Sequence, residues 1–211
     1  LDTHPARITL CPGRTSQFHL QLHSGVDEPL RATVLLVAPP GLAVDSAPQP
    51  VEIAPRGHVS LPVAVKVEEQ AFYALPVVVQ WTDGNAEHTL RETLSLPSLA
   101  PGGLIAYRQD DTVTLETERL AVVAHALEGS VAIEDKRLRS TIGSMGPLLG
   151  APFWPSDLAR VSFELDLKQH DGQAIVKMVG RSKSRNGLTL HQTLRFSAGG
   201  LLQLNYGLEN R

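Results

Sequence analysis

The chain has 211 residues, of which 19% are charged, and a formal net charge of -3 at pH 7. That length allows one large sandwich or two ordinary domains, each able to bury its own core. Basic and acidic residues are interleaved without a basic stripe, which disfavours nucleic acid as a partner, and no apolar run is long enough to insert into a membrane. The single cysteine, Cys11, excludes an internal disulfide and a cysteine-ligated zinc site, and it fits a reducing compartment or a secreted bacterial protein without disulfides.

The first half of the chain alternates apolar and polar residues with period two, which is typical of half-buried strands. Turn residues separate the runs, and Asp83-Gly84-Asn85 is the clearest hairpin signal. We expect Trp81 to turn one face into the core. The stretch from Val67 to Ala74 is the only one compatible with a helical turn, but we expect it to connect the two sheets. Seven strands about a dozen residues apart predict an antiparallel immunoglobulin-like sandwich over residues 1–97. The runs are 7–10, 17–23, 32–38, 51–54, 59–67, 75–82 and 88–96.

Residues 98–103 are rich in proline and glycine and indicate a linker, followed by a second β-sandwich over residues 104–211. The expected fold class is therefore all-β, with two antiparallel sandwich domains. The turns His170-Asp171-Gly172 and Arg185-Asn186-Gly187 predict two successive hairpins. The apolar and alternating runs of this region are 113–123, 129–133, 161–167, 174–180, 188–197 and 201–208.

Between those runs lies an unusually apolar loop, Gly143 to Asp157, with the sequence GSMGPLLGAPFWPSD. Three prolines so close together exclude a regular helix or a central strand, because each removes a backbone donor and fixes φ. Phe153 and Trp154 lie at its centre. We expect these aromatic side chains either to plug the core or to face a ligand, and plugging is the commoner role of an aromatic beside prolines.

Two family resemblances follow from these runs. A strand, a proline-containing turn and a returning strand occur at residues 8–22 and again at 51–63, and this doubled phrase resembles the NPCBM-associated domain of bacterial alpha-galactosidases. That resemblance implies an accessory domain. Residues 112–210, from VTLETERLAVVAHALEGSVAIE through the apolar loop to the closing YGLEN, are similar to the first part of a galactose-mutarotase-like domain. This second resemblance implies a sugar-binding supersandwich, of which these residues would form the first part.

Candidate catalytic groups are sparse. In the mutarotase-like family a histidine acts as general acid near the sugar ring oxygen, which singles out His191 and, in a turn, His170; no glutamate partner can be assigned from the sequence. Glu116 and Glu118 would share one strand face, as on any solvated strand. The ligand-binding candidates are the aromatic residues Tyr107, Phe153 and Trp154, and no metal site or cofactor is expected.

The leading hypothesis is a non-catalytic β-sandwich portion of a larger bacterial protein, secreted or in the cell envelope, that binds carbohydrate or spaces domains. The parent would be a carbohydrate-active protein such as a glycoside hydrolase. The alternatives are a complete sugar epimerase or lyase that uses His191, and a structural or adhesive sandwich pair. The chain starts at Leu1 without a methionine or signal peptide, which indicates a fragment. A sheet edge at Leu201 to Leu208 would invite pairing with a second copy, so a homodimer is expected as a possible assembly.

Overall fold

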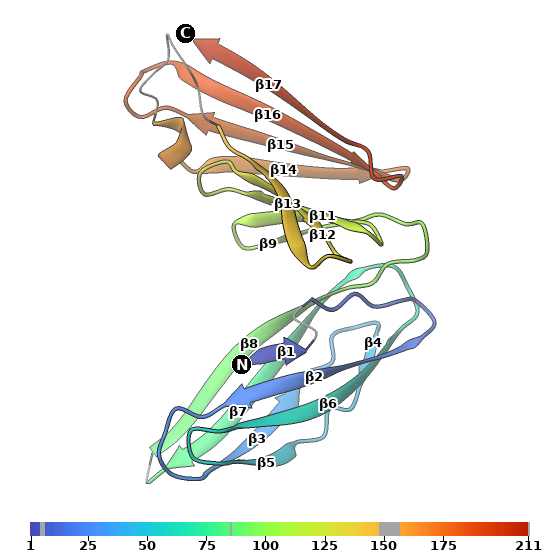
Figure 1. Ribbon diagram of the computed structural model, residues 1–211, viewed down its shortest axis with the longest axis vertical. Helices are drawn as coiled ribbons and strands as arrows, with labels where there is room; N and C mark the ends of the chain where they lie inside the picture. The colour runs from blue at the N-terminus through green and yellow to red at the C-terminus, as the bar shows by residue number, and fades with distance from the viewer. Residues whose placement is uncertain (5–6, 85, 148–156, 211) are drawn as a thin grey trace. The chain divides into compact units, whose positions relative to one another are not determined.

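A computed structural model describes residues 1–4, 7–84, 86–147 and 157–210. These residues form antiparallel sheets and one 3-10 turn, Leu158–Arg160, so the protein is all-β as the periodicity predicts. The chain divides into two compact units, Leu1–Ala100 and Pro101–Arg211 (Figure 1). The division falls within the predicted linker. Ser98 and Leu99 are nevertheless buried, because both are hydrogen-bonded into the first unit.

The first unit is a sandwich of two four-stranded sheets. One sheet has the order β1-β2-β6-β4 and the other β5-β3-β7-β8. The pairing of β2 with β6 in one sheet, and of β7 with both β3 and β8 in the other, is the arrangement of an immunoglobulin-like sandwich. The strands are β1 (Asp2–His4), β2 (Thr15–His23), β3 (Leu30–Leu36), β4 (Leu42–Val44), β5 (Gln49–Ile53), β6 (His58–Val67), β7 (Phe72–Asp83) and β8 (Ala86–Pro97).

Two details of this unit differ from the expectation. The short strands β1 and β4 carry too few residues to show a period, and the sequence did not predict them. The run at residues 7–10 is no strand, since only Leu10 makes a bridge, to Ser98. The stretch from Val67 to Ala74 connects the two sheets, as expected, because β6 ends at Val67 in one sheet and β7 begins at Phe72 in the other.

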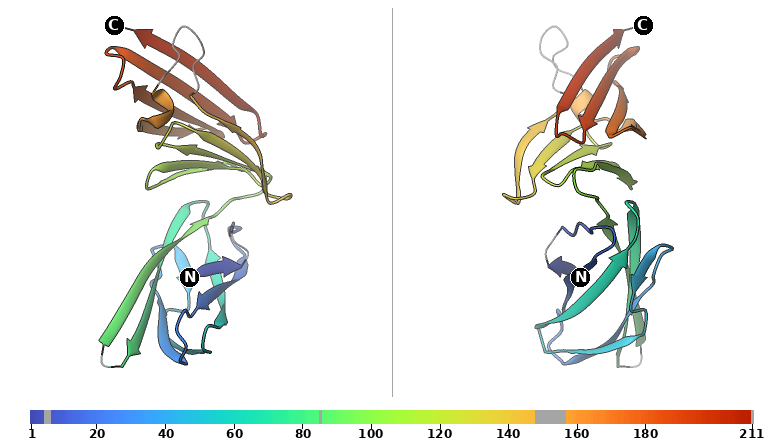
Figure 2. Two further views of the ribbon diagram at one scale, coloured as in Figure 1. Left: turned by 60° about the vertical axis from the view of Figure 1, so that its left-hand side comes forward. Right: turned by 90° about the vertical axis from the view of Figure 1, so that its right-hand side faces the viewer.

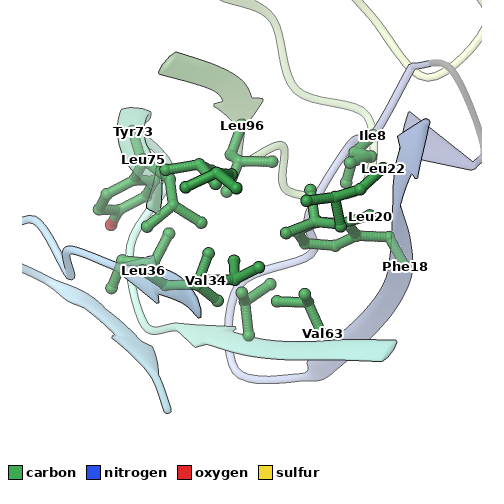
Figure 3. Close-up of a cluster of buried hydrophobic side chains, with 14 of the residues drawn as sticks. Ile8, Phe18, Leu20, Leu22, Val34, Leu36, Val63, Tyr73, Leu75 and Leu96 are labelled. Atoms are coloured by element: carbon green, nitrogen blue, oxygen red, sulfur yellow. The ribbon is translucent and has the colours of Figure 1, made fainter. Parts of the chain in front are cut away.

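The alternation of apolar and polar residues along the strands determines which side chains form the core of the first unit. Phe18, Leu20 and Leu22 are buried on β2, and the residues between them are exposed or partly so. They meet residues such as Leu75 from the opposite sheet in one apolar cluster (Figure 3). Burying a side chain of this size contributes about 1.5–3 kcal/mol. Trp81 packs partly buried against this cluster, as predicted.

The second unit is a sandwich of two meanders, one of five strands and one of four, which lie face to face (Figure 2). Its apolar core takes residues from both sheets, such as Leu115 and Val122 from one and Met178 and Leu194 from the other. The strands are β9 (Ile105–Gln109), β10 (Thr112–Glu116), β11 (Leu120–His125), β12 (Val131–Asp135), β13 (Ser140–Met145), β14 (Phe163–His170), β15 (Gln173–Arg181), β16 (Leu188–Ser197) and β17 (Leu202–Asn210).

The four-stranded meander follows the predicted runs, whereas the five-stranded one does not. The run at 113–123 divides into β10 and β11 around a turn at residues 117–119, and neither β9 nor β13 was predicted. Edge strand β13 includes Gly143, Ser144 and Met145, so the first three residues of the predicted apolar loop belong to a strand. Both predicted hairpin turns are confirmed. Asp171 and Gly172 have φ values of 47° and 69°, the left-handed pair that a two-residue hairpin of type I′ requires.

One aromatic ring fixes the start of the four-stranded sheet. Phe163 is 4% exposed and lies opposite Gly180 across β14 and β15. A Cβ added at Gly180 would come 2.4 Å from the Phe163 ring, and one added at Gly129 would come 2.5 Å from it. Two glycines therefore make the slot that this ring fills.

Candidate functional site

The outward face of the four-stranded sheet of the second unit gathers its polar side chains, and we call it the polar face. Alternation turns residues such as Leu190 and Leu194 inward and their neighbours His191 and Thr193 outward. The strand register then aligns one row of outward residues across the sheet. This row consists of Asp166, Lys177, Thr193 and Asn205.

The row combines different hydrogen-bonding groups at neighbouring positions. Asp166 offers acceptors, Lys177 offers donors, and Thr193 and Asn205 offer both. Asp166, Lys177 and Asn205 are exposed and Thr193 is partly exposed. A ligand with several hydroxyl groups could therefore both donate and accept hydrogen bonds along this row.

His191 lies on the same face, two residues along β16 from Thr193. Its Nε2 is 3.3 Å from Glu209 Oε2, and the two side chains are 45% and 38% exposed. Gly207, directly opposite His191, has no side chain, which leaves the imidazole open on that side. Glu209 is thus the carboxylate neighbour that the sequence could not assign, and only the register of β16 with β17 reveals it.

His170 does not join this site. It ends β14 and pairs with Gln173, six residues along β15 from Val179, the residue opposite His191. At about 3.3 Å per residue the two histidines are separated by roughly 20 Å. His170 Nε2 instead lies 2.7 Å from the carboxylate of Asp171 at the exposed hairpin tip.

Asp157 holds the hairpin loop at one end of the polar face. Its carboxylate accepts hydrogen bonds from the Ser182 hydroxyl, from Lys183 N at 2.7 Å and from Ser184 N at 2.9 Å. Burial acts to raise the pKa of Asp157, but these hydrogen bonds outweigh it and lower the pKa from 3.8 to about 2. The loop that joins β15 to β16 is therefore ordered by one carboxylate.

Tyr107, a ligand-binding candidate from the sequence, lies in β9 and is 8% exposed. Its hydroxyl donates to Glu116 Oε1 at 2.6 Å, and Lys136 Nζ donates to Glu116 Oε2 at 3.0 Å and to the Thr117 carbonyl at 3.1 Å. The ring therefore presents little surface for stacking on a sugar. Glu116 is fully buried, so the expectation of a solvated strand face shared with Glu118 is wrong.

The other candidates can be placed only in part. Phe153 and Trp154 lie outside the described residues. Among the residues that are described, no cluster of three or more His, Cys, Asp or Glu side chains could hold a metal ion. Within the same residues, no helix has the length and apolar character needed to cross a membrane.

Comparison with known proteins gives a limited result. No protein-family model and no curated protein sequence matches this chain. Among solved structures, the chain is similar to SSP-19 of Caenorhabditis elegans, described as an MSP-domain protein like family member. The TM-score is 0.32 at 19% identity, covering 46% of this chain and 99% of that one.

Proposed function

We propose that this chain is a non-catalytic β-sandwich portion of a larger carbohydrate-active protein, and that the polar face of its second unit binds carbohydrate. The observation that carries the proposal is the aligned row Asp166, Lys177, Thr193 and Asn205. Its donors and acceptors stand on four adjacent strands, and sheet strands are rigid supports for such a site. The two family resemblances favour a bacterial parent, such as a glycoside hydrolase, that is secreted or in the cell envelope.

Direct binding measurements test this proposal. The chain is screened against a glycan array and by affinity electrophoresis on soluble polysaccharides, alongside the double variant Lys177→Ala/Asn205→Ala. We expect retention by at least one glycan and its loss in the variant, because two of the four polar groups are removed. Trp154→Ala tests the stacking role predicted for that residue. The matched control is Glu87→Ala on an exposed position of the first unit. Absence of binding to every polymer would remove the carbohydrate claim.

One observation favours a second candidate function, a sugar epimerase that uses His191. The imidazole is exposed and has a carboxylate at 3.3 Å, which is the kind of orientation that a general acid or base requires. Polarimetry of freshly dissolved galactose measures this activity directly. Loss of protein-dependent mutarotation in His191→Ala and in Glu209→Gln would support it, and equal rates for the three proteins would exclude it.

We propose a second kind of partner as well. A further copy of this chain would pair along the exposed edge strand β17. The second copy would bond to the outward backbone groups of β17, whereas carbohydrate would bond to side chains of the polar face.

A further inference from the structure

Strand β17 is an edge strand with unusually little protection against pairing. Among the described strands it pairs with β16 alone, and Figure 1 shows it at the margin of its sheet. Its nine residues include one charged side chain, Glu209. Proteins usually guard such edges with charges or proline. Three other edge strands carry charged residues or proline: β8 has Glu87, Arg91 and Glu92, β14 has Glu164, Asp166 and Lys168, and β5 has Pro50 and Glu52. The shorter edge strand β13 has neither.

The hydrogen bonds of the sheet determine which backbone groups of β17 face outward. Ser197 N donates to Leu201 O, so these two residues form a hydrogen-bonded pair. Because bonded and non-bonded pairs alternate in an antiparallel ladder, odd-numbered residues of β17 bond to β16. The hairpin of β15 and β16 is consistent with this. Ser182 N donates to Leu188 O, so the even-numbered residues of β16 form their backbone hydrogen bonds with β15.

Even-numbered residues of β17 consequently direct their N–H and C=O groups away from the sheet. Their side chains point to the inward face, because β17 pairs them with inward residues of β16. Three of these side chains remain exposed: Tyr206 at 51%, Leu208 at 40%, and the terminal Asn210. The five residues with outward backbone groups are Leu202, Leu204, Tyr206, Leu208 and Asn210.

The sequence of β17 is self-complementary about Tyr206. If two copies pair antiparallel with Tyr206 opposite itself, all nine residues find a partner, and Leu204 meets Leu208 of the other copy on the apolar face. On the polar face Glu209 meets Gln203, so no like charges are opposed. Every outward backbone group lies in a hydrogen-bonded pair in this register, which gives about ten new hydrogen bonds. If the pairing shifts by one residue, even-numbered residues of one copy lie opposite odd-numbered residues of the other. Inward side chains would then lie beside outward ones.

We propose, building on the second-copy partner proposed above, that this protein forms a homodimer in which two copies of β17 pair antiparallel with Tyr206 on the twofold axis. The two four-stranded sheets then continue as one sheet of eight strands. The arrangement is closed and isologous, as most homodimers are. It places Tyr206 against Tyr206 of the second copy and Leu208 against its Leu204, and it removes the open edge.

Charge substitution at the axis tests both the dimer and its register. In Tyr206→Lys two ammonium groups face each other, and in Tyr206→Glu two carboxylates do. Each variant alone should dimerise roughly tenfold or more weakly than the wild type, because a packed pair is replaced by like charges. A one-to-one mixture should restore the dimer through a Lys–Glu pair. Sedimentation equilibrium on the full chain measures all four samples.

Gln203→Lys is the matched control. It adds the same charge to the same strand but places it opposite Glu209 of the second copy, so dimerisation should be retained or strengthened. Circular dichroism and thermal unfolding show that each variant is folded. A wild type that is monomeric across the accessible concentration range would overturn the proposal. So would an unweakened Tyr206→Lys dimer, or a mixture of the two charge variants that stays monomeric.

Discussion

Removal of the Lys136 ammonium is the sharpest test of how the second unit tolerates a buried carboxylate. Glu116 has no exposed surface, and Lys136 Nζ lies 3.0 Å from its Oε2 with the Lys136 side chain 14% exposed. Lys136→Met keeps most of the apolar stem and removes the charge. Breaking a buried ion pair by deleting one partner costs about 3–5 kcal/mol, because the remaining charge stays desolvated.

We expect the lower end of that range, about 3 kcal/mol, since the ion pair of Glu116 and Lys136 is not wholly shut off from water. A domain of this size typically has a stability of about 5–15 kcal/mol, so the variant should lose a large part of it. Tyr107→Phe removes a hydrogen bond to the same carboxylate and should cost less, about 1.5–3 kcal/mol.

Urea titration with pulsed hydrogen exchange read by mass spectrometry gives the unfolding midpoint of each unit separately. Peptides from β10 and β11 should unfold at lower urea in Lys136→Met, and peptides from β7 should be unchanged. The double variant Glu116→Gln/Lys136→Met should recover much of the loss, because it leaves no unpaired charge. A change below about 0.5 kcal/mol in Lys136→Met, the range of an ordinary surface substitution, would refute this account of the pair.

Two further predictions concern the four-stranded sheet of the second unit and the hairpin loop between its strands β15 and β16. Gly180→Ala brings a Cβ to 2.4 Å from the Phe163 ring and should destabilise the second unit by about 1–3 kcal/mol in urea titration. The matched Gly207→Ala, whose Cβ would meet its neighbour at 3.7 Å, should change stability by less than about 0.5 kcal/mol. Asp157 has a pKa lowered to about 2 in the folded state, so its carboxylate stabilises the fold above the unfolded pKa near 3.8 and this contribution is lost as pH falls towards 2. As the pH falls from about 3.8 to about 2, the free energy of unfolding of Asp157→Asn should decrease less than that of the wild type. An equal decrease in both proteins would contradict a stabilising role for the Asp157 carboxylate.

The sequence predicts most long strands because one buried face imposes a period of two. β2, β6 and β16 alternate over nine or ten residues, and their positions were predicted to within two residues. β1 and β4 have three residues each, too few for any period. β9, with five residues, and β13, with six, were also missed. Turn chemistry was equally informative, since Asp171-Gly172 requires the left-handed conformation that it adopts.

The pairs within the sites could not be predicted in the same way. Glu116 seemed an ordinary solvated carboxylate because its charge and its alternation with Glu118 suggest exposure. Its partners Tyr107 and Lys136 are 9 and 20 residues away in the chain. Only the register of β9 with β10, and the turn after β12, bring the three groups together. His191 and Glu209 depend in the same way on the register of β16 with β17.

Carbohydrate binding and dimerisation use alternate residues of the same strand, β17. Odd-numbered residues of β17, such as Gln203 and Asn205, belong to the polar face and bond to β16, whereas even-numbered residues such as Tyr206 belong to the apolar face and the open edge. A twofold axis through Tyr206 runs perpendicular to the sheet, so both polar faces of the dimer would lie on one surface. Two linked sites on one surface raise the apparent affinity for a polymeric ligand without any new contact. Tyr206→Lys should therefore weaken binding to a polysaccharide but not to a single short oligosaccharide, and equal weakening of both would show that Tyr206 acts at the ligand site itself.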